Sequence, residues 1–302
     1  MLLLKVVFIE VRMGDGENLQ ADRVSANFVK SSAANTGIDV TDLKSVDSTN
    51  SWCLRQCEAG KGLPFICFAQ EQTSGRGRRG KQWFMAARSN IAMSVAWSFS
   101  APNQSLQLLP LSIALAIAET LESLGLKQVQ IKWPNDVYLQ GVKIAGILIE
   151  TQPVKNRQDD KQLAVVIGVG LNYDMSVFAP DILKKLPALT DVCEQVELQK
   201  IAVKPERDDI ARSLQENVVA ACQAYPYALK ENLSKFRARY DYCKDKNVEI
   251  ILDNKEVLSG VAQGLNDNAE LLVLIEGEQR VFNSAEVSVK PVNVSLKTKG
   301  QS

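Results

Sequence analysis

Residues 75–81, GRGRRGK, combine glycines with cations in a pattern suited to binding phosphate. Glycine lets the backbone approach a ligand closely, and an arginine guanidinium grips phosphate or carboxylate through paired hydrogen bonds. The spacing Gly75-x-Gly77-x-x-Gly80 also satisfies the dinucleotide-binding fingerprint, which requires a helix directly after the loop. The next residues, KQWFMAARSN, carry no apolar stripe of helical period, which argues against that interpretation.

The charge around this loop is unbalanced along the chain, because no Asp or Glu occurs between residues 72 and 118. The cations without an acidic neighbour in sequence are Arg76, Arg78, Arg79, Lys81 and Arg88. A charge run is usually a solvated face, but cations between glycines favour an anionic ligand. Nucleic acid stays an alternative at this point, since Trp83 could stack on a base.

A second segment, KWPNDVYLQGVKIAGILIE at 132–150, places charges beside strongly apolar residues. Its plain interpretation is a strand, a turn containing Asn135 and Asp136, and a second strand. Lys143 needs a partner if it is buried among its apolar neighbours, and a ligand carboxylate or phosphate would supply one. Gly146 would let a flat group approach the strand. A third segment, GVGLN at 168–172, is either a tight strand end or the floor of a pocket.

Composition limits the chemistry that the chain can perform. It contains no histidine, which excludes Ser-His-Asp and Cys-His nucleophiles and His-ligated zinc. Lys plus Arg and Asp plus Glu both number 35, so bulk charge does not predict a protein that coats nucleic acid or an anionic membrane. The six cysteines form no CxxC motif and indicate reduced, buried thiols of a cytosolic protein.

Hydrophobic patterns predict the elements that position these segments. Ser48, Thr49 and Asn50 precede an amphipathic run and mark a helix start. Strands are predicted at 63–70, 90–99, 128–133, 137–151 (a pair around Gly141) and 163–172. A long helix at 105–125 is expected to be buried rather than to span a membrane, and 205–239 is helical in pattern. Antiparallel hairpins suit this order better than a doubly wound parallel sheet.

The two ends of the chain differ from its middle. Residues 248–292 alternate short strands with turn residues, which predicts a small all-β barrel of about five strands. Near the start, residues 1–10 predict a first strand and 11–40 a loosely ordered lead-in. Residues 156–162 predict a solvated loop.

Taken together, the segments resemble the biotin protein ligases, which activate biotin with ATP and transfer it to a carrier-protein lysine. The matching stretches are DSTN at 47–50, EQTSGRGRRGKQW at 71–83, KWPNDVYLQGVKIAGILIE at 132–150 and IGVGLN at 167–172. The resemblance implies an α+β fold, with a central mixed, largely antiparallel sheet, flanking helices and a small C-terminal SH3-like β-barrel. The implied divisions are a lead-in at 1–40, a catalytic domain at 41–240, the barrel at 241–294 and a polar tail at 295–302.

The resemblance also implies roles for individual residues. Biotin would be bound by Ser48, Thr49, Asn50, Gln72, Arg76, Gly77, Arg78, Lys143, Gly146, Gly168 and Gly170, the last three letting its rings lie against backbone. ATP and the adenylate would be bound by Arg78, Arg79, Lys81, Trp83, Asn135, Asp136, Lys143 and Asn172. The catalytic residues would be Lys143, Asp136 and Arg78, with Asp136 the candidate for helping the acceptor lysine to lose its proton.

ATP and Mg²⁺ are the implied cosubstrate and ion, and no metal site made of protein groups alone is expected. The implied partner is a biotin carboxyl carrier protein of the acetyl-CoA carboxylase type. Repressor members of the family carry an N-terminal winged helix-turn-helix, a pattern that residues 1–40 do not show, so we expect a cytoplasmic ligase that binds neither DNA nor membrane. A homodimer is left open, as is a ligand contact of Lys290, which stands where an arginine can occur.

Three alternatives remain open on sequence. A lipoate–protein ligase shares the catalytic architecture, although GRGRRG together with KWPND favours biotin. A nucleic-acid-binding module would use the basic loop and Trp83, and its binding would depend steeply on salt. A biotin-binding regulator without catalysis would be expected to lack Lys143 or Asp136, and both are present.

Overall fold

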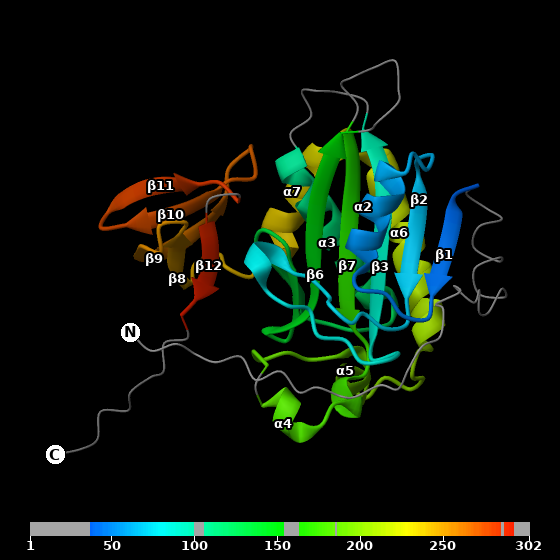
Figure 1. The fold of residues 1–302 in the computed structure, drawn as a ribbon. Helices are drawn as coiled ribbons and strands as arrows, with labels where there is room; N and C mark the ends of the chain where they lie inside the picture. Colours follow the sequence, from blue (N-terminus) through cyan, green and yellow to red (C-terminus); the bar gives the residue numbers. More distant parts are fainter. Residues whose placement is uncertain (1–36, 100–105, 154–162, 185, 285–286, 293–302) are drawn as a thin grey trace, which may run out of the picture.

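The computed structural model describes residues 37–99, 106–153, 163–184, 186–284 and 287–292. They form a seven-stranded sheet with helices on both faces, and a separate five-stranded sheet beside it (Figure 1). The strand predicted at 1–10, the loop at 156–162 and the tail at 295–302 lie outside the described residues. Most of the lead-in also lies outside them, and its last two residues already belong to strand β1.

The larger sheet carries the candidate segments on its central strands. Its strand order is β1-β2-β3-β7-β6-β5-β4. The strands are β1 Asp39–Leu43, β2 Phe65–Ala69, β3 Asn90–Phe99, β4 Val129–Lys132, β5 Asp136–Leu139, β6 Val142–Pro153 and β7 Leu163–Asn172. Strands β1 and β2 are parallel, and all other neighbours in this sheet are antiparallel. The predicted mixed, largely antiparallel sheet is therefore confirmed.

Helices cover both faces of this sheet, which explains why its central strands are apolar along their whole length. Helix α2 (Thr49–Glu58) lies on one face against β3 and β7, while α3 (Leu109–Ser123) and α6 (Arg207–Ala224) pack on the other. The predicted start of α2 is confirmed, since Ser48 is its N-cap and accepts a hydrogen bond from the Ser51 amide.

The segment Leu106–Ser123 is long and apolar enough to cross a membrane, but 61% of it is buried inside the protein. It begins with the 3₁₀ turn η2 (Leu106–Leu108) and continues as α3, whose apolar side chains fill the core against the sheet and α6. The helix ends just before Gly125, whose φ of +85° is the left-handed conformation that terminates helices. The prediction of a buried helix is confirmed.

Sequence patterns left residues 173–204 unassigned, and this segment forms short helices below the sheet. The remaining helical pieces are η1 Arg78–Gly80, η3 Met175–Val177, α4 Pro180–Leu183, α5 Val192–Leu198, α7 Leu229–Lys235 and the π-helical turn η4 Phe236–Tyr240. The helical region predicted at 205–239 is divided into α6 and α7, because the chain leaves the helix between Ala224 and Leu229, around Pro226, and α7 continues directly into η4.

The five-stranded sheet follows the last helical turn. Its strands are β8 Asn247–Leu252, β9 Val257–Leu265, β10 Leu271–Ile275, β11 Glu278–Phe282 and β12 Val287–Pro291. All neighbours are antiparallel, in the order β11-β10-β9-β8-β12. The predicted count of five strands is confirmed.

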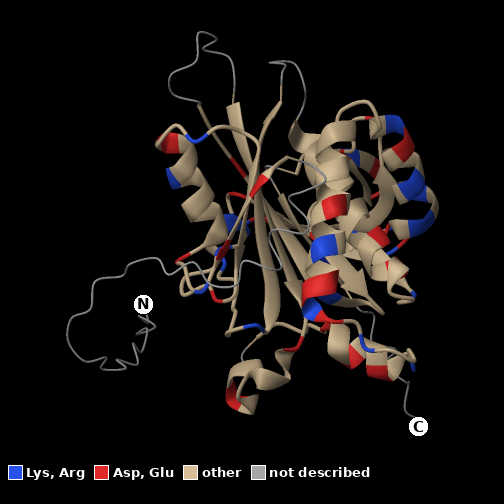
Figure 2. Cartoon of the chain, turned by 90° about the vertical axis from the view of Figure 1, so that its right-hand side faces the viewer, with Lys and Arg blue, Asp and Glu red and all other residues tan. Residues whose placement is uncertain are grey.

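The two sheets are joined by specific contacts. The Trp133 indole N–H donates to the Ala269 carbonyl over 2.9 Å, and Arg237 contacts both the Leu265 carbonyl (3.1 Å) and Asp267 (2.8 Å). On the outer surface, cations and carboxylates are interspersed on the helices (Figure 2). This mixture agrees with the equal numbers of acidic and basic residues.

Candidate active site

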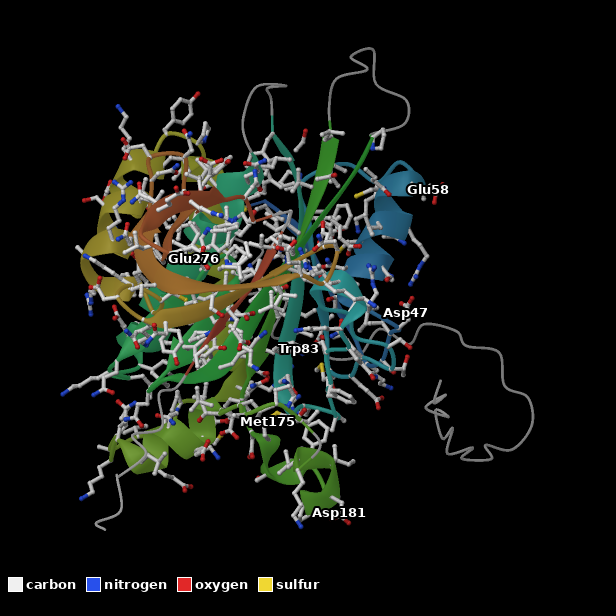
Figure 3. The ribbon with its side chains drawn as sticks, turned by 90° about the vertical axis from the view of Figure 1, so that its left-hand side faces the viewer. Asp47, Glu58, Trp83, Met175, Asp181 and Glu276 are labelled. Atoms are coloured by element: carbon white, nitrogen blue, oxygen red, sulfur yellow. The ribbon has the colours of Figure 1, made fainter. Side chains whose placement is uncertain are left out.

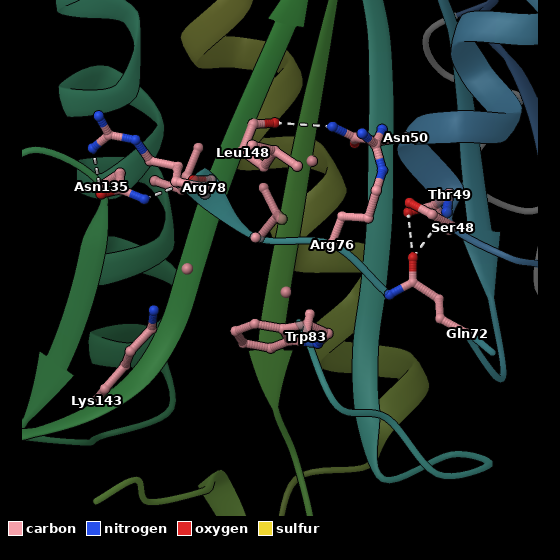
Figure 4. A pocket seen from close by; sticks show the side chains of 16 residues that line it. Ser48, Thr49, Asn50, Gln72, Arg76, Arg78, Trp83, Asn135, Lys143 and Leu148 are labelled. Carbon is pink, nitrogen blue, oxygen red and sulfur yellow. Dashed lines mark hydrogen bonds between the residues drawn. The ribbon is translucent and has the colours of Figure 1, made fainter. Parts of the chain in front are cut away.

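A cavity of about 60 Å³ lies on the α2 side of β6 and β7 (Figure 4). Its walls come from the helix start, the glycine loop and the two central strands, segments far apart in sequence. The lining residues are Ser48, Thr49, Asn50, Gln72, Arg76, Gly77, Arg78, Trp83, Asn135, Lys143, Gly146, Ile147, Leu148, Gly168, Val169 and Gly170.

One end of the cavity is a buried polar cluster at the start of α2. The Thr49 amide and hydroxyl both donate to Gln72 Oε1, over 2.8 and 3.1 Å. Ser94 Oγ lies 2.7 Å from both Thr49 Oγ1 and Asn50 Oδ1. With its oxygen committed to Thr49, Gln72 keeps its amide nitrogen as a donor for a ligand. The cluster offers donors and acceptors in fixed directions, as recognition of a small polar ring requires.

The loop from Gly75 to Trp83, hereafter the flap, forms the outer wall. The Gly77 amide donates to the Lys81 carbonyl (2.7 Å) and the Trp83 amide to the Gly75 carbonyl (2.9 Å). Within it the chain makes one 3₁₀ turn and then continues extended towards β3, with no α-helix following. The helix N-terminus that a dinucleotide fingerprint needs is therefore missing from this part of the structure.

The flap arginines find acidic partners that are distant in sequence. Arg76 forms a bidentate ion pair with Glu150, at 2.9 and 2.6 Å, and Arg79 pairs with Asp253 at 2.9 Å. Outside the flap, Arg88 lies 3.5 Å from Asp208. The charge imbalance seen along the sequence is thus largely compensated by the tertiary structure.

Arg78 differs from its neighbours because its hydrogen-bond partners are neutral. Its guanidinium donates to Asn135 Oδ1 over 3.0 Å and to the Ser284 carbonyl over 2.5 Å. Burial, followed by the neighbouring Arg79 charge, lowers the pKa of Arg78. A half-buried cation without a carboxylate hydrogen-bonded to it is suited to hold an anionic ligand.

Lys143 lies at the opposite end of the cavity and already has a partner. Its ammonium is 2.6 Å from Asp136 Oδ1, and Lys132 approaches the other oxygen of Asp136 at 3.6 Å. The sequence predicted that Lys143 needs a partner, of which a ligand carboxylate or phosphate is one; within the protein, that partner is Asp136. The Lys143 ammonium also lies 5.8 Å from the ring centre of Trp83.

The three strand glycines make room for protein side chains. A Cβ on Gly170 would lie 2.5 Å from the Trp83 indole, and one on Gly146 would lie 3.3 Å from it. A Cβ on Gly168 would overlap the Asn50 carboxamide. In Figure 3 Trp83 lies above Met175 of η3 and Asp181 of α4. Its indole nitrogen is buried without a hydrogen-bond partner among the described residues.

Some predicted site residues do not line the cavity. Arg79 is held by Asp253, Lys81 is exposed, and Asp136 reaches the cavity only through Lys143. Asn172 is buried between the Asn90 side chain (2.8 Å) and the Thr190 carbonyl (3.0 Å). Asn172 therefore fixes the end of β7 to β3 and to the Thr190 backbone.

Lys290 also lies away from the cavity, 3.7 Å from Glu249. Within the described residues, no group of three or more His, Cys, Asp or Glu side chains is placed to hold a metal ion.

Two polar residues beside the cavity, Ser94 and Glu150, were not singled out from the sequence. Ser94 is the polar residue within the otherwise apolar stretch IAMSVAW, and it supports the cluster at the helix start. Glu150 ends the segment 132–150 and shares a strand face with Gly146 and Leu148, since alternate residues point the same way. That period of two was the signal that could have placed Glu150 in the site.

Comparison with known proteins agrees with this geometry. The sequence model of the Biotin/lipoate A/B protein ligase family matches residues 43–172, and that of the Biotin protein ligase C terminal domain matches residues 245–290. A biotin--[acetyl-CoA-carboxylase] ligase of Paracoccus denitrificans is 30% identical over 251 residues, which are 81% of this chain and 98% of that protein. The chain belongs to the biotin protein ligase family.

One further relative supports this family, and one solved structure shows the same fold. The bifunctional ligase/repressor BirA of Salmonella typhimurium is 30% identical over 256 residues, 83% of this chain and 74% of that protein. The fold matches that of the biotin protein ligase of Aquifex aeolicus with a TM-score of 0.66 at 23% identity, over 84% of this chain and 99% of the other. The match of the C-terminal domain model favours the biotin ligases over the lipoate ligases that share the first family model.

Proposed function

We propose that this protein is an ATP-dependent biotin protein ligase that forms biotinyl-5'-AMP from biotin and ATP. It then transfers biotin to a lysine of a biotin carboxyl carrier protein of the acetyl-CoA carboxylase type. The observation that carries the proposal is the meeting of four distant motifs around one cavity with a polar cluster at one end and cations at the other. The named activities of relatives that align with most of this chain support it.

Biotin is proposed to lie between these two ends. Ser48, Thr49, Asn50 and Gln72 would bind its ureido ring, and Lys143 would hold its carboxylate. The flap, with Gly77 and Arg78, would close over the ligand, because these residues already form one wall of the cavity.

In the first half-reaction, a biotin carboxylate oxygen bonds to the α-phosphorus of ATP, and the bond from phosphorus to the pyrophosphate oxygen breaks. This displacement depends on positioning and on positive charge at the phosphates rather than on a proton-transferring residue. Arg78 and Lys143 would supply that charge, and Mg²⁺ would enter bound to ATP. A chain without histidine is compatible with such a step.

The adenosine side of the site is proposed to contain Trp83 and Asn135. The indole offers a flat surface between the flap and β7, and Asn135 already bonds Arg78. Arg79 and Lys81 would reach ATP only after the flap moves, since Asp253 holds Arg79 and Lys81 is exposed.

In the second half-reaction, the acceptor amine attacks the acyl carbon of biotinyl-AMP, and the bond from carbon to the phosphate oxygen breaks to release AMP. The amine must first lose a proton. Asp136 is fully engaged by Lys143 and Lys132 in this structure, so we propose that it chiefly orients Lys143. This replaces the sequence-based hypothesis that Asp136 assists the deprotonation.

The cellular setting is also part of the proposal. All six cysteines are free and buried, as expected of a protein that works in the reducing cytoplasm. The carrier protein is the proposed macromolecular partner, and a homodimer and the absence of DNA and membrane partners stay predictions. We also propose two domains, at residues 41–240 and 241–294, because each of these ranges contains one of the two separate sheets.

Biotin-dependent exchange of label between pyrophosphate and ATP tests the proposal directly. We expect exchange with biotin and at most weak exchange with lipoate, and calorimetry should show biotin binding that strengthens with a non-hydrolysable ATP analogue. Exchange with lipoate alone would favour the lipoate ligase alternative. Steeply salt-dependent binding of nucleic acid without any biotin binding would refute the proposal.

A further inference from the structure

Glu150 places a carboxylate beside a cavity that is otherwise equipped to attract anions. Its side chain is 25% exposed and points to the cavity side of β6, where Gly146 and Leu148 line the wall. An uncompensated carboxylate there would repel both the biotin carboxylate and the ATP phosphates. Glu150 therefore requires a positively charged partner, and its position beside the cavity requires a functional explanation.

Both oxygens of Glu150 are fully engaged. Arg76 donates from Nη1 to Oε1 over 2.9 Å and from Nη2 to Oε2 over 2.6 Å, and Asn50 Nδ2 donates to Oε2 over 2.9 Å. A bidentate arginine–carboxylate pair fixes both partners in direction as well as in distance. One side chain on β6 thus fastens the flap to the start of helix α2.

The contact with Asn50 determines which way its carboxamide points. The Asn50 nitrogen donates to Glu150 and also to the Leu148 carbonyl over 3.1 Å, so both of its hydrogens are used. The carboxamide oxygen must then face Ser94, 2.7 Å away, beside Gly168. Removing Glu150 would free one N–H of Asn50 and loosen this orientation.

The flap arginines consequently have different tasks. Arg76 forms an ion pair with Glu150, whereas the hydrogen-bond acceptors of Arg78 are neutral. Among the flap arginines, Arg78 is the one left for an anionic ligand, while Arg76 fastens the flap to Glu150.

We propose that Glu150 is a positioning residue that couples closure of the flap to recognition of biotin. It does so by bonding Arg76 of the flap and Asn50 of the recognition cluster at the same time. Closure of the flap then fixes the orientation of the Asn50 side chain, and a ligand that fixes this orientation favours the closed flap. The inference rests on the proposed biotin ligase function for its ligand, but not for its effect on the flap.

The test compares three variants of the full chain. Glu150→Ala removes both contacts. The exchange Arg76→Glu/Glu150→Arg restores an ion pair to the flap but leaves no acceptor for Asn50. Glu119→Gln is the matched control, because it removes a carboxylate paired with Lys235 (3.4 Å) on α3, outside the cavity. Cleavage by trypsin after Arg78, Arg79 and Lys81, sites that all three variants keep, reports the flap when it is followed by mass spectrometry without ligand. The KM for biotin and for ATP reports the site.

For Glu150→Ala we expect tryptic cleavage in the flap to accelerate and the KM for biotin to rise, each about tenfold or more, the effect of losing a charge-assisted hydrogen bond. The KM for ATP should change less than the KM for biotin. The exchange variant should recover the slow cleavage but keep the raised KM for biotin. A merely structural role of Glu150 would change the cleavage rate and the KM for biotin together. If Glu150→Ala does not fold, the exchange variant alone tests whether they separate.

Two outcomes overturn the inference. One is cleavage and KM values of Glu150→Ala that equal those of Glu119→Gln, and the other is full recovery of the biotin KM in the exchange variant. If the unaltered protein binds no biotin, the proposed function fails as well. The cleavage rates, measured without biotin, then still show whether Glu150 fastens the flap.

Discussion

Replacing Gly170 by alanine tests whether the wall formed by Trp83 matters for the reaction. A Cβ at this position would lie 2.5 Å from two atoms of the indole. Carbon atoms in contact prefer a separation of about 3.5 Å, so the indole must move by about 1 Å. Because Trp83 belongs to the flap rather than to a strand, we expect the flap, and not β7, to yield.

A shift of about 1 Å in a positioning group can cost about a hundredfold in rate. We therefore expect kcat/KM for biotin-dependent pyrophosphate exchange to fall between about tenfold and a hundredfold, or ~1.4–2.7 kcal/mol. The free energy of unfolding should change by less than about 1 kcal/mol, below the usual cost of overpacking a rigid core. Exchange rates and urea denaturation of the same preparations measure both quantities.

Two other glycines provide controls. Gly62→Ala places its Cβ in open space and should change neither quantity. Gly260→Ala places its Cβ 2.5 Å from the Leu274 carbonyl, a backbone atom that cannot move aside, so it should lower stability without a specific loss of exchange.

The decisive comparison is a double-mutant cycle with Trp83→Ala. If the methyl group acts by displacing the indole, Gly170→Ala should cause little further loss in the Trp83→Ala background. Additive losses, or unchanged exchange in Gly170→Ala alone, would refute the reasoning.

Three further predictions concern charged side chains. Arg78→Gly should speed the release of biotinyl-AMP and the labelling of unrelated lysines, detected by trapping the adenylate and blotting bystander proteins; release equal to that of the parent would contradict this role. Asp136→Asn should leave Lys143 and Lys132 uncompensated, lowering exchange about a hundredfold and the free energy of unfolding by roughly 1–3 kcal/mol; Glu119→Gln, measured alongside, should do neither. Burial raises the pKa of Asp241 above its usual value of 3.8, against the opposing hydrogen bonds from the Cys243 and Lys244 amides. Native Asp241 then holds its proton more tightly than the unfolded chain does, so stability relative to Asp241→Asn should fall as the pH rises above 3.8; urea denaturation at about pH 4 and pH 7 checks the sign.

Local sequence signals located most elements of the catalytic sheet. The apolar runs at β2, β3 and β7 predicted buried strands, and Ser48 predicted the start of α2, because side-chain period and capping act over a few residues. Residues 173–204 were not assigned, since α4 and α5 span 4 and 7 residues, too short for a periodic signal. All 16 residues that line the cavity lie in the four quoted motifs, and only Ile147, Leu148 and Val169 among them had no role predicted from the sequence.

By itself, the sequence determined which residue types the site contains and the chemistry open to them. The absence of histidine excluded whole classes of mechanism, and glycines beside arginines predicted an anionic ligand. The tertiary structure decided which charges pair with one another. Arg76 pairs with Glu150, Arg79 with Asp253 and Lys143 with Asp136, whereas Arg78 hydrogen-bonds only neutral groups. The physical reason is that electrostatic partners depend on distance in space, and the fold brings Arg79 to Asp253, which is 174 positions away in sequence, in a way that no local pattern encodes.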